Sequence, residues 1–180
     1  MITAKMVLLF VLQSSDVSSL GVNTEMIDSD EALCLAQAVY YEARSETTAG
    51  QFAVAHVTLN RVKDPRFPKT VCKVVRQAIL SNNGVKLQCA YSWYCDNEAG
   101  NVPVRNNKGE QNESVMEQFR TASLVAITAL ASKSEDNTNG ATYFFNPKIC
   151  NPNWARTMVM TKRIGNHDFY RPSVILASNS

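Results

Sequence analysis

Apolar residues recur at helical spacing in the first third of the chain. Asp28-x-x-Glu31 has the pattern of a capping box, which predicts the start of a helix. The helix that follows has an apolar stripe at positions i, i+3 and i+4 counted from Leu35, and Glu42 stands at i+7 on the same stripe. A charged residue is not expected at the end of an apolar face. Glu46 lies beyond it in the polar break "SETT", where we expect it to be solvated.

Three further helices are predicted downstream. Thr48-x-x-Gln51 is a second capping box, and the segment "AGQFAVAHVTLNRV" is apolar nearly all round, which is typical of a buried central helix. "DPRFP" ends this helix, because proline cannot continue the hydrogen-bond ladder. Apolar residues at helical spacing then predict a helix of about three turns over residues 71–79 and a long helix over residues 116–132.

The remaining segments are predicted to be extended or irregular. Residues 81–112 form a long Asn- and Gly-rich loop that contains the cluster "QCAYSWYCD", and a loop of this length in a compact domain is usually functional. "ATYFF" has the pattern of a short strand, and "MVMTKRIGNHDFY" is β-prone with a break at Gly165-Asn166. Helices come first and strands last, so the order of elements predicts an α+β domain that is mostly α.

Composition limits the number of domains and the kinds of partner. The chain has 180 residues, 45% of them hydrophobic and 19% charged, which is enough for one domain with a proper core. The net charge of +2 comes without a basic tail or a Lys/Arg cluster, so we expect no nucleic-acid partner.

The chain is predicted to consist of an N-terminal segment, residues 1–27, and one domain, residues 28–180. Lys5 and the apolar run 6–12 resemble the start of an export signal, although no clean cleavage site follows. The alternative is a segment that packs on the domain. An apolar run this short cannot span a bilayer, so we expect no stable membrane span.

The five cysteines allow a local bridge and leave at least one thiol unpaired in a monomer. Cys89 and Cys95 could form that bridge in an oxidising compartment. Their spacing is not that of a zinc knuckle, so no metal site is expected. Cys34, near a helix N-terminus, would suit a Cys–His nucleophile, but no neighbouring motif supports this role.

Glu42 is the strongest catalytic candidate. Its carboxyl stands beside Tyr40 and Tyr41 and should be partly desolvated, which raises a carboxyl pKa toward the range of a general acid near neutral pH. The alternative is an ion pair with a nearby arginine. Structural ion pairs are commoner than catalytic acids, so periodicity alone favours the ion pair.

Two other clusters leave alternatives open. The aromatic residues of "CAYSWYCD" could stack on a sugar, or they could fill the core inside a disulfide-closed loop. His167 is a candidate base, but adjacent strand residues point to opposite faces, so we do not expect it to pair with Asp168. His56, on the buried helix, is expected to be a core histidine with a hydrogen-bond partner.

Several sequence blocks together carry a family resemblance. They are "LAQAVYYEARSE", "GQFAVAHVTLNRVKDPRFPKTVCKVV", "CAYSWYCD", "GATYFFNP", "NWA" and "RIGNHDFYR". In this order they resemble SleB-type cell-wall hydrolases, a group of spore-cortex-lytic enzymes and related bacterial and phage lysins. The resemblance runs from about residue 31 to 171. It implies a compact lysozyme-like, goose-type transglycosylase fold and cleavage of peptidoglycan between N-acetylmuramic acid and N-acetylglucosamine.

The resemblance makes Glu42, the glutamate of the family's YxEARxE block, the catalytic acid, and so reverses the preference for an ion pair. One glutamate that acts as acid and then as base fits a lytic transglycosylase, which leaves a 1,6-anhydro ring. A hydrolytic muramidase would use a second carboxylate, for which Asp96 and Glu46 are the candidates. The substrate contacts that the resemblance implies are Tyr91, Ser92, Trp93, Tyr143, Asn146 and His167.

One departure and two rival functions accompany this prediction. Many relatives have Gln-Phe-Ser where this chain has Ala90-Tyr91-Ser92, which puts a polar role of that first position in doubt. The rivals are a Cys–His amidase or endopeptidase that uses Cys34 and His167, and a non-catalytic peptidoglycan-binding module. We expect a monomer without a cofactor that binds glycan strands. It would act at the cell wall, reached by export or, for a phage endolysin, by host lysis.

Overall fold

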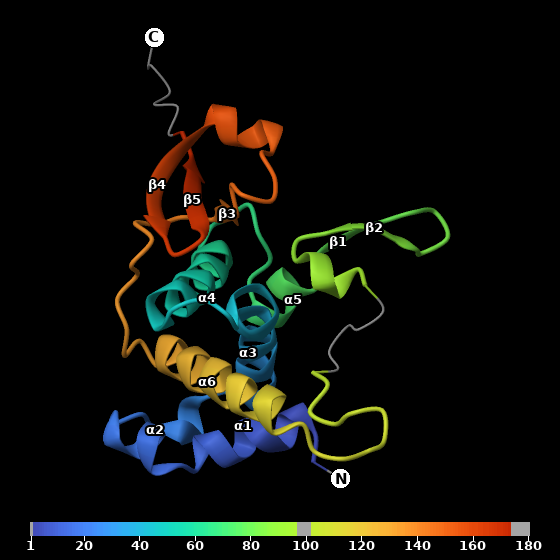
Figure 1. Ribbon diagram of the computed structural model, residues 1–180. Coiled ribbons are helices and arrows are strands. Elements are labelled where there is room, and N and C mark those ends of the chain that lie inside the picture. The colour runs from blue at the N-terminus through green and yellow to red at the C-terminus, as the bar shows by residue number, and fades with distance from the viewer. Residues whose placement is uncertain (1, 97–101, 174–180) are drawn as a thin grey trace.

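The computed structural model describes residues 2–96 and 102–173, and it is an α+β domain that is mostly α, as predicted (Figure 1). The α-helices are α1 (Ala4–Leu12), α2 (Ser15–Ser19), α3 (Ser29–Ala43), α4 (Thr48–Lys63), α5 (Val71–Val75) and α6 (Glu113–Leu130). The 3-10 helices are η1 (Thr24–Met26), η2 (Ser92–Tyr94) and η3 (Asn153–Thr157). The strands are β1 (Ala78–Leu80), β2 (Lys86–Cys89), β3 (Tyr143–Phe145), β4 (Met158–Ile164) and β5 (His167–Pro172).

The helices form a stack with a sheet at one end. In Figure 1, α1 and α2 lie at the bottom, α6 crosses above them, and α3, α4 and α5 lie between α6 and the sheet. One core joins these helices, and its fully buried side chains include Leu8 of α1, Leu35 and Val39 of α3, and Phe119 of α6. The burial of these apolar side chains is the main stabilising contribution to the helical part of the fold.

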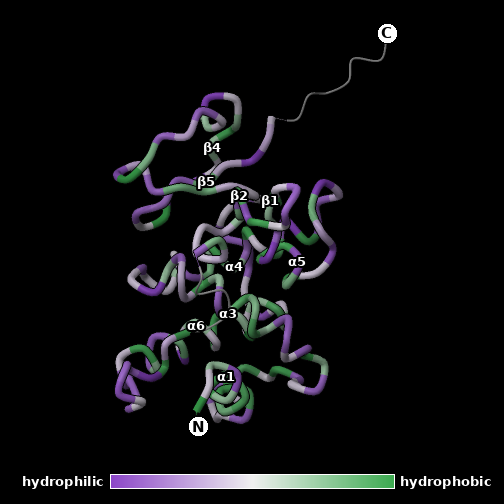
Figure 2. The backbone as a smooth tube through the Cα atoms, turned by 90° about the vertical axis from the view of Figure 1, so that its right-hand side faces the viewer, coloured by the Kyte–Doolittle hydropathy of each residue, from purple (hydrophilic) through white to green (hydrophobic). Residues whose placement is uncertain are grey.

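The N-terminal segment is part of that core. Val7 and Leu8 are buried against the other helices, and α1 is hydrophobic along most of its length (Figure 2). Within the described residues, no helix is both long and apolar enough to cross a bilayer. Removal of residues 1–27 as an export segment stays a prediction.

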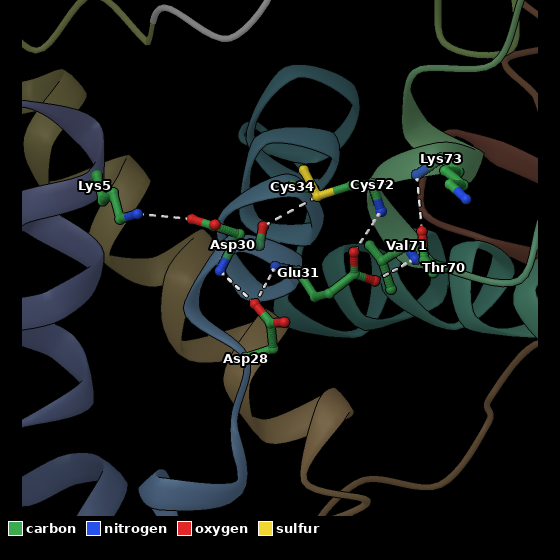
Figure 3. The surroundings of a disulfide bond; sticks show 9 residues. All are labelled: Lys5, Asp28, Asp30, Glu31, Cys34, Thr70, Val71, Cys72 and Lys73. Carbon is green, nitrogen blue, oxygen red and sulfur yellow. Dashed lines mark hydrogen bonds and ion pairs between the residues drawn. A yellow bond between two sulfur atoms is a disulfide. The ribbon is translucent and has the colours of Figure 1, made fainter.

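The predicted start of α3 is confirmed, and α4 begins one residue earlier than predicted. Asp28 caps α3, and its carboxylate accepts from the backbone N–H groups of Asp30 and Glu31. Glu31 does not complete a capping box. Its carboxylate accepts instead from the first backbone N–H groups of α5, at Val71 and Cys72 (Figure 3). These two bonds satisfy backbone donors at the start of α5 and hold that end of α5 against the start of α3.

The cap of α4 is Thr47 and not the predicted Thr48. The Thr47 hydroxyl accepts from the backbone N–H of Gly50 at 3.3 Å. The side chain of Gln51 donates to the carbonyl of Glu46 at 3.4 Å. Two adjacent threonines, Thr47 and Thr48, can each serve as the N-cap, so the pattern alone did not fix the helix start to the residue.

The helix predicted over residues 71–79 is wrong in its second half. It ends at Val75, and Ala78–Leu80 form β1, which pairs antiparallel with β2. The two residues that extended the helical pattern are not core residues, since Ala78 is only half-buried and Ile79 is 60% exposed. Part of the predicted loop 81–112 is therefore a hairpin strand, and residues 97–101 of that loop lie outside the described residues.

The late strands form one antiparallel sheet in the order β3-β5-β4. The predicted break at Gly165-Asn166 is the two-residue turn between β4 and β5. Gly165 has φ 58°, a conformation that glycine adopts without steric cost. A second small core, of Ala53 and Val57 on α4 with Ala141 and Phe169, holds the sheet on the helices.

Two disulfides cross-link the helical part and the hairpin. Cys89–Cys95 closes the aromatic loop, as predicted from the sequence. Cys34 pairs with Cys72 and joins α3 to α5 beside the Glu31 cap (Figure 3). The proposal of a Cys34 nucleophile is therefore wrong, because a disulfide sulfur is not a thiolate. Cys150 is the exposed free thiol.

We expect the two disulfides to stabilise the fold unequally. A bridge between residues 38 apart closes a longer chain loop than one between residues 6 apart. In the chain-entropy model, loss of the first costs about 4 kcal/mol and loss of the second about 2 kcal/mol. Urea unfolding of Cys34→Ser/Cys72→Ser and of Cys89→Ser/Cys95→Ser should show this order, and the reverse order would contradict it.

Candidate active site

Glu42 lies in the last turn of α3 and is partly buried. Burial raises the pKa of its carboxyl from the ordinary 4.5 to about 7, and the positive charge of Arg61 opposes this rise. Desolvation disfavours the ionised form more than the arginine favours it. A substantial fraction of Glu42 is therefore protonated at neutral pH, which is the state that a general acid needs.

Arg61, on α4, is a buried cation beside Glu42. Its side chain is fixed by a hydrogen bond from Nε to the carbonyl of Thr142 at 2.7 Å, and the residue is only 7% exposed. Three aromatic rings surround its guanidinium carbon, those of Tyr91 at 5.2 Å, Phe67 at 5.6 Å and Tyr143 at 5.8 Å. Its Nη1 is buried without a hydrogen-bond partner among the described residues. A guanidinium so enclosed keeps its charge and acts on Glu42 in a medium that screens poorly.

The aromatic loop packs on α3, and two of its predicted substrate contacts are buried. Tyr91 is 1% exposed, and its hydroxyl bonds to Thr58 Oγ1 at 2.6 Å. Trp93 is 6% exposed and stacks on Tyr41 with ring centres 4.6 Å apart. Neither ring offers a face to a sugar, so the core-filling interpretation of "CAYSWYCD" describes them. Ser92, between them, is exposed.

A cavity of about 380 Å³ opens between the β1–β2 hairpin and the sheet. Its lining is Gln77, Ala78, Ile79, Gln88, Cys89, Ala90 and Tyr143. Glu42 does not line this cavity directly. Tyr143 connects the cavity with the surroundings of Glu42, because it lines the cavity and its ring lies near Arg61, whose charge acts on Glu42. Ala90 lines the same cavity, so a longer polar side chain at that position would reach into it.

The other two predicted contacts lie away from the cavity lining. The amide of Asn146 accepts from the backbone N–H of Lys148 at 2.9 Å, which forms a turn. His167 is 8% exposed, and its Nδ1 lies 4.0 Å from Oε1 of Glu46. As expected, His167 does not pair with Asp168, which binds Arg163 on the opposite side of the strand. His56 is a core histidine bonded to Ser134, also as expected.

Glu46 contrasts with Glu42, although the two stand only four positions apart in the chain. The prediction of a solvated Glu46 is wrong, since its side chain is 7% exposed. Burial alone would raise the pKa of this carboxyl, but two hydrogen bonds from Asn166 and the nearby His167 and Lys148 lower it overall. Glu42 is thus shifted toward the protonated form and Glu46 toward the ionised form. Environments that push two carboxyl pKa values apart in this way are typical of a pair in which one group serves as the acid and the other stays charged.

Sequence reasoning missed Arg61, and it missed the burial of Glu46, which it considered only as a second carboxylate. A usable indication existed for Arg61, because a charge on a helix that is apolar nearly all round must be buried or paired. No indication existed for the burial of Glu46, whose partner Asn166 is 120 residues away. In the described part of the chain, no three His, Cys, Asp or Glu side chains are grouped to hold a metal ion.

The helical stack, the small sheet and the partly buried acid define a lysozyme-like α+β domain. Residues 45–170 match the family described as Cell Wall Hydrolase, and the chain belongs to this family. The matched range begins just after Glu42, so the match does not include this residue.

Sequence relatives agree with the family. The spore cortex-lytic enzyme of Halalkalibacterium halodurans is 34% identical over 142 residues, which are 79% of this chain and 34% of that protein. The spore cortex-lytic enzyme of Bacillus subtilis is 34% identical over 135 residues, which are 75% of this chain and 35% of that protein. The chain thus spans about a third of the length of these curated relatives.

Two solved structures share the fold. The catalytic domain of the Bacillus cereus SleB protein superposes with a TM-score of 0.53 at 31% identity, covering 80% of this chain and 91% of that one. The catalytic domain of the germination-specific lytic transglycosylase SleB from Bacillus anthracis gives 0.55 at 27% identity, covering 81% and 98%.

Proposed function

We propose that this protein cleaves the glycan strand of peptidoglycan between N-acetylmuramic acid and N-acetylglucosamine, by lytic transglycosylation, with Glu42 as acid and then base. The observation that carries the proposal is the Glu42 carboxyl, which is partly buried, has a pKa of about 7 and stands beside Arg61. Membership of the cell wall hydrolase family and the SleB likeness supply the substrate class.

The chemistry needs one proton that leaves Glu42 and returns. The carboxyl protonates the glycosidic oxygen as its bond to the muramyl C1 breaks, and positive charge develops on the sugar ring. The muramyl C6 hydroxyl then attacks C1, and its proton returns to the Glu42 carboxylate, which leaves a 1,6-anhydro ring. Between the two steps Glu42 is ionised, and the charge of Arg61 stabilises it there.

The surroundings of the other acids favour transglycosylation over hydrolysis. A muramidase would use a second carboxylate that faces the sugar or its attacking water. Both carboxylate oxygens of Glu46 are bound to Asn166, and its side chain is buried. Asp96 is exposed on the aromatic loop. Of the predicted contacts, Tyr143 and Ser92 are those we propose to meet the glycan, since Tyr143 lines the cavity and Ser92 is exposed.

Mass spectrometry of digested sacculi tests this function. Muropeptides that end in anhydromuramic acid are expected. Reducing ends would instead indicate a muramidase, and free stem peptides would indicate an amidase or endopeptidase. Binding to sacculi without any release of fragments, even at high protein concentration, would indicate a non-catalytic module. Each of these three results would overturn the proposal.

We expect the cleavage rate to fall as the pH rises through about 7. The acid must be protonated to donate, and a carboxyl with a pKa of about 7 loses that proton over this range. Initial rates on sacculi at constant ionic strength, from about pH 5 to about pH 9, should follow the loss of a single proton. Sedimentation with sacculi provides the control, because binding should not fall in parallel. A rate that stays constant to about pH 9 would contradict the assignment.

A further inference from the structure

The backbone N–H and the backbone carbonyl of Glu46 are both hydrogen-bonded to neighbouring helices. It lies at the corner between α3, which carries Glu42, and α4. Its N–H donates to the carbonyl of Ala43, the last residue of α3, at 2.9 Å. Its own carbonyl accepts from Gln51 Nε2 of α4. The backbone of Glu46 therefore moves with the end of the helix that carries the acid.

The Glu46 side chain reaches from this corner to the sheet. Its Oε1 accepts from Asn166 Nδ2 at 2.9 Å, and its Oε2 accepts from the Asn166 backbone N–H at 3.1 Å. Asn166 belongs to the turn between β4 and β5. Charge-assisted bonds of this kind, made by a buried carboxylate, are stronger than bonds between neutral groups.

Two glycines make room for the Glu46 side chain. A Cβ built on Gly165 would lie 2.2 Å from Oε2 of Glu46, and one built on Gly50 would lie 2.9 Å from the Glu46 Cβ. Real Cβ atoms do not approach other atoms this closely. The α3–α4 corner and the β4–β5 turn are thus fitted around the carboxylate.

The bonded turn continues into the wall of the cavity. β5 begins directly after Asn166 and pairs with β3, in which Tyr143 stands opposite Tyr170. Tyr143 lines the cavity and also lies near Arg61. The bonds of Glu46 therefore connect the end of the acid-bearing helix with the sheet that contributes Tyr143 to the cavity lining.

We propose that Glu46 is a positioning residue, which holds the α3–α4 corner on the β4–β5 turn and so fixes Glu42 relative to the Tyr143 wall. The inference rests on the proposed function, because positioning is read out as glycan cleavage. Small misplacements of a catalytic group cost large factors in rate, since the reacting atoms must stay within narrow limits of distance and angle. The separate core of α4 and the sheet keeps the two layers together without Glu46.

Gly165→Ala tests the role without removing the carboxylate. The new Cβ would displace Glu46 from Asn166, while Glu42 and Arg61 stay unchanged. Gly109→Ala is the matched control, because Gly109 also has a positive φ, of 80°, but a Cβ there meets nothing within 4 Å. We expect Gly165→Ala and Glu46→Ala to lower kcat by about 10- to 100-fold with little change in KM. Gly109→Ala should keep the wild-type values.

A double-mutant cycle separates positioning from direct chemistry. If Glu46 acts through Asn166, Glu46→Ala/Asn166→Ala should be no slower than Glu46→Ala alone. Additive losses, or a Gly165→Ala rate equal to that of Gly109→Ala, would overturn the proposal. A variant of Glu46 that lost only the anhydromuramic products or only the reducing-end products would also overturn it, because that result would indicate that Glu46 takes part in the chemistry.

Hydrogen exchange keeps the two proposals distinguishable. In Glu46→Ala, amide exchange should rise both at the β4–β5 turn and at the α3–α4 corner, and in Gly109→Ala at neither. A rise at the turn alone would overturn the linkage, whatever the activity. If the wild-type protein released no glycan fragments, the proposed function would fail and the positioning role of Glu46 in catalysis with it, even if exchange at the corner and the turn were linked.

Discussion

Glu42→Gln should nearly abolish glycan cleavage and leave the fold intact. Glutamine has nearly the same shape as glutamic acid but has no acidic proton to give to the leaving oxygen. A general acid contributes about 10²- to 10⁴-fold to a rate, so we expect residual activity between about a hundredth and about a ten-thousandth. Quantitative mass spectrometry of muropeptides released from sacculi measures this loss. Glu117→Gln is the matched control, because the Glu117 side chain is 76% exposed on α6.

The same variant should be more stable than the wild type at alkaline pH, which separates lost chemistry from lost folding. The Glu42 pKa is about 7 in the folded protein against 4.5 ordinarily, so the folded state binds more protons between these values. The stability of the wild type therefore falls as the pH rises through that window, by about 3 kcal/mol in total. Glutamine avoids this loss. Urea unfolding should show Glu42→Gln ahead of the wild type at about pH 8 and level with it near pH 4.

Either of two results would contradict the role of Glu42. Retention of about a tenth of the wild-type rate by Glu42→Gln would show that another group supplies the proton. Equal stabilities of variant and wild type at every pH would show that the Glu42 carboxyl is not held protonated by burial.

Glu42 could be found from the sequence because its unusual position is a local feature. Helical spacing from Leu35 places it on the buried stripe of α3, and the structure shows the desolvation that this position implies. The sheet and its turn were predictable for the same reason, since β-prone residues flank Gly165-Asn166 in the chain.

The features that the sequence did not reveal depend on distant residues. Glu46 stands in a polar stretch, and only its contact with Asn166 makes it a buried carboxylate. Tyr91 lies among exposed loop residues in sequence, yet its bond to Thr58 of α4 places it in the core. At the β1–β2 hairpin the apolar side chain of Ile79 is exposed, so its helical spacing from Val75 was misleading.

Arg61→Met should slow cleavage and extend the remaining activity to higher pH. A positive charge beside a carboxyl favours its ionised form, and Arg61 lowers the pKa of Glu42 in this way. Without that charge the Glu42 pKa rises, so the acid stays protonated to higher pH. The ionised Glu42 between the two steps also loses its stabilising partner, which should lower the rate by about tenfold for each 1.4 kcal/mol lost. Initial rates across the pH range measure both effects.

Arg61→Lys distinguishes the charge of Arg61 from its packing. Methionine and lysine both fill much of the space among the rings of Tyr91, Phe67 and Tyr143. Both lack the planar guanidinium, so both lose the hydrogen bond from Arg61 Nε to the carbonyl of Thr142. Only lysine keeps the positive charge. If Arg61 acts on Glu42 through its charge, the alkaline fall in rate should stay near the wild-type pH in Arg61→Lys and move upward in Arg61→Met. An equal shift in both variants would mean that the packing of the rings, and not the guanidinium charge, sets the acidity of Glu42.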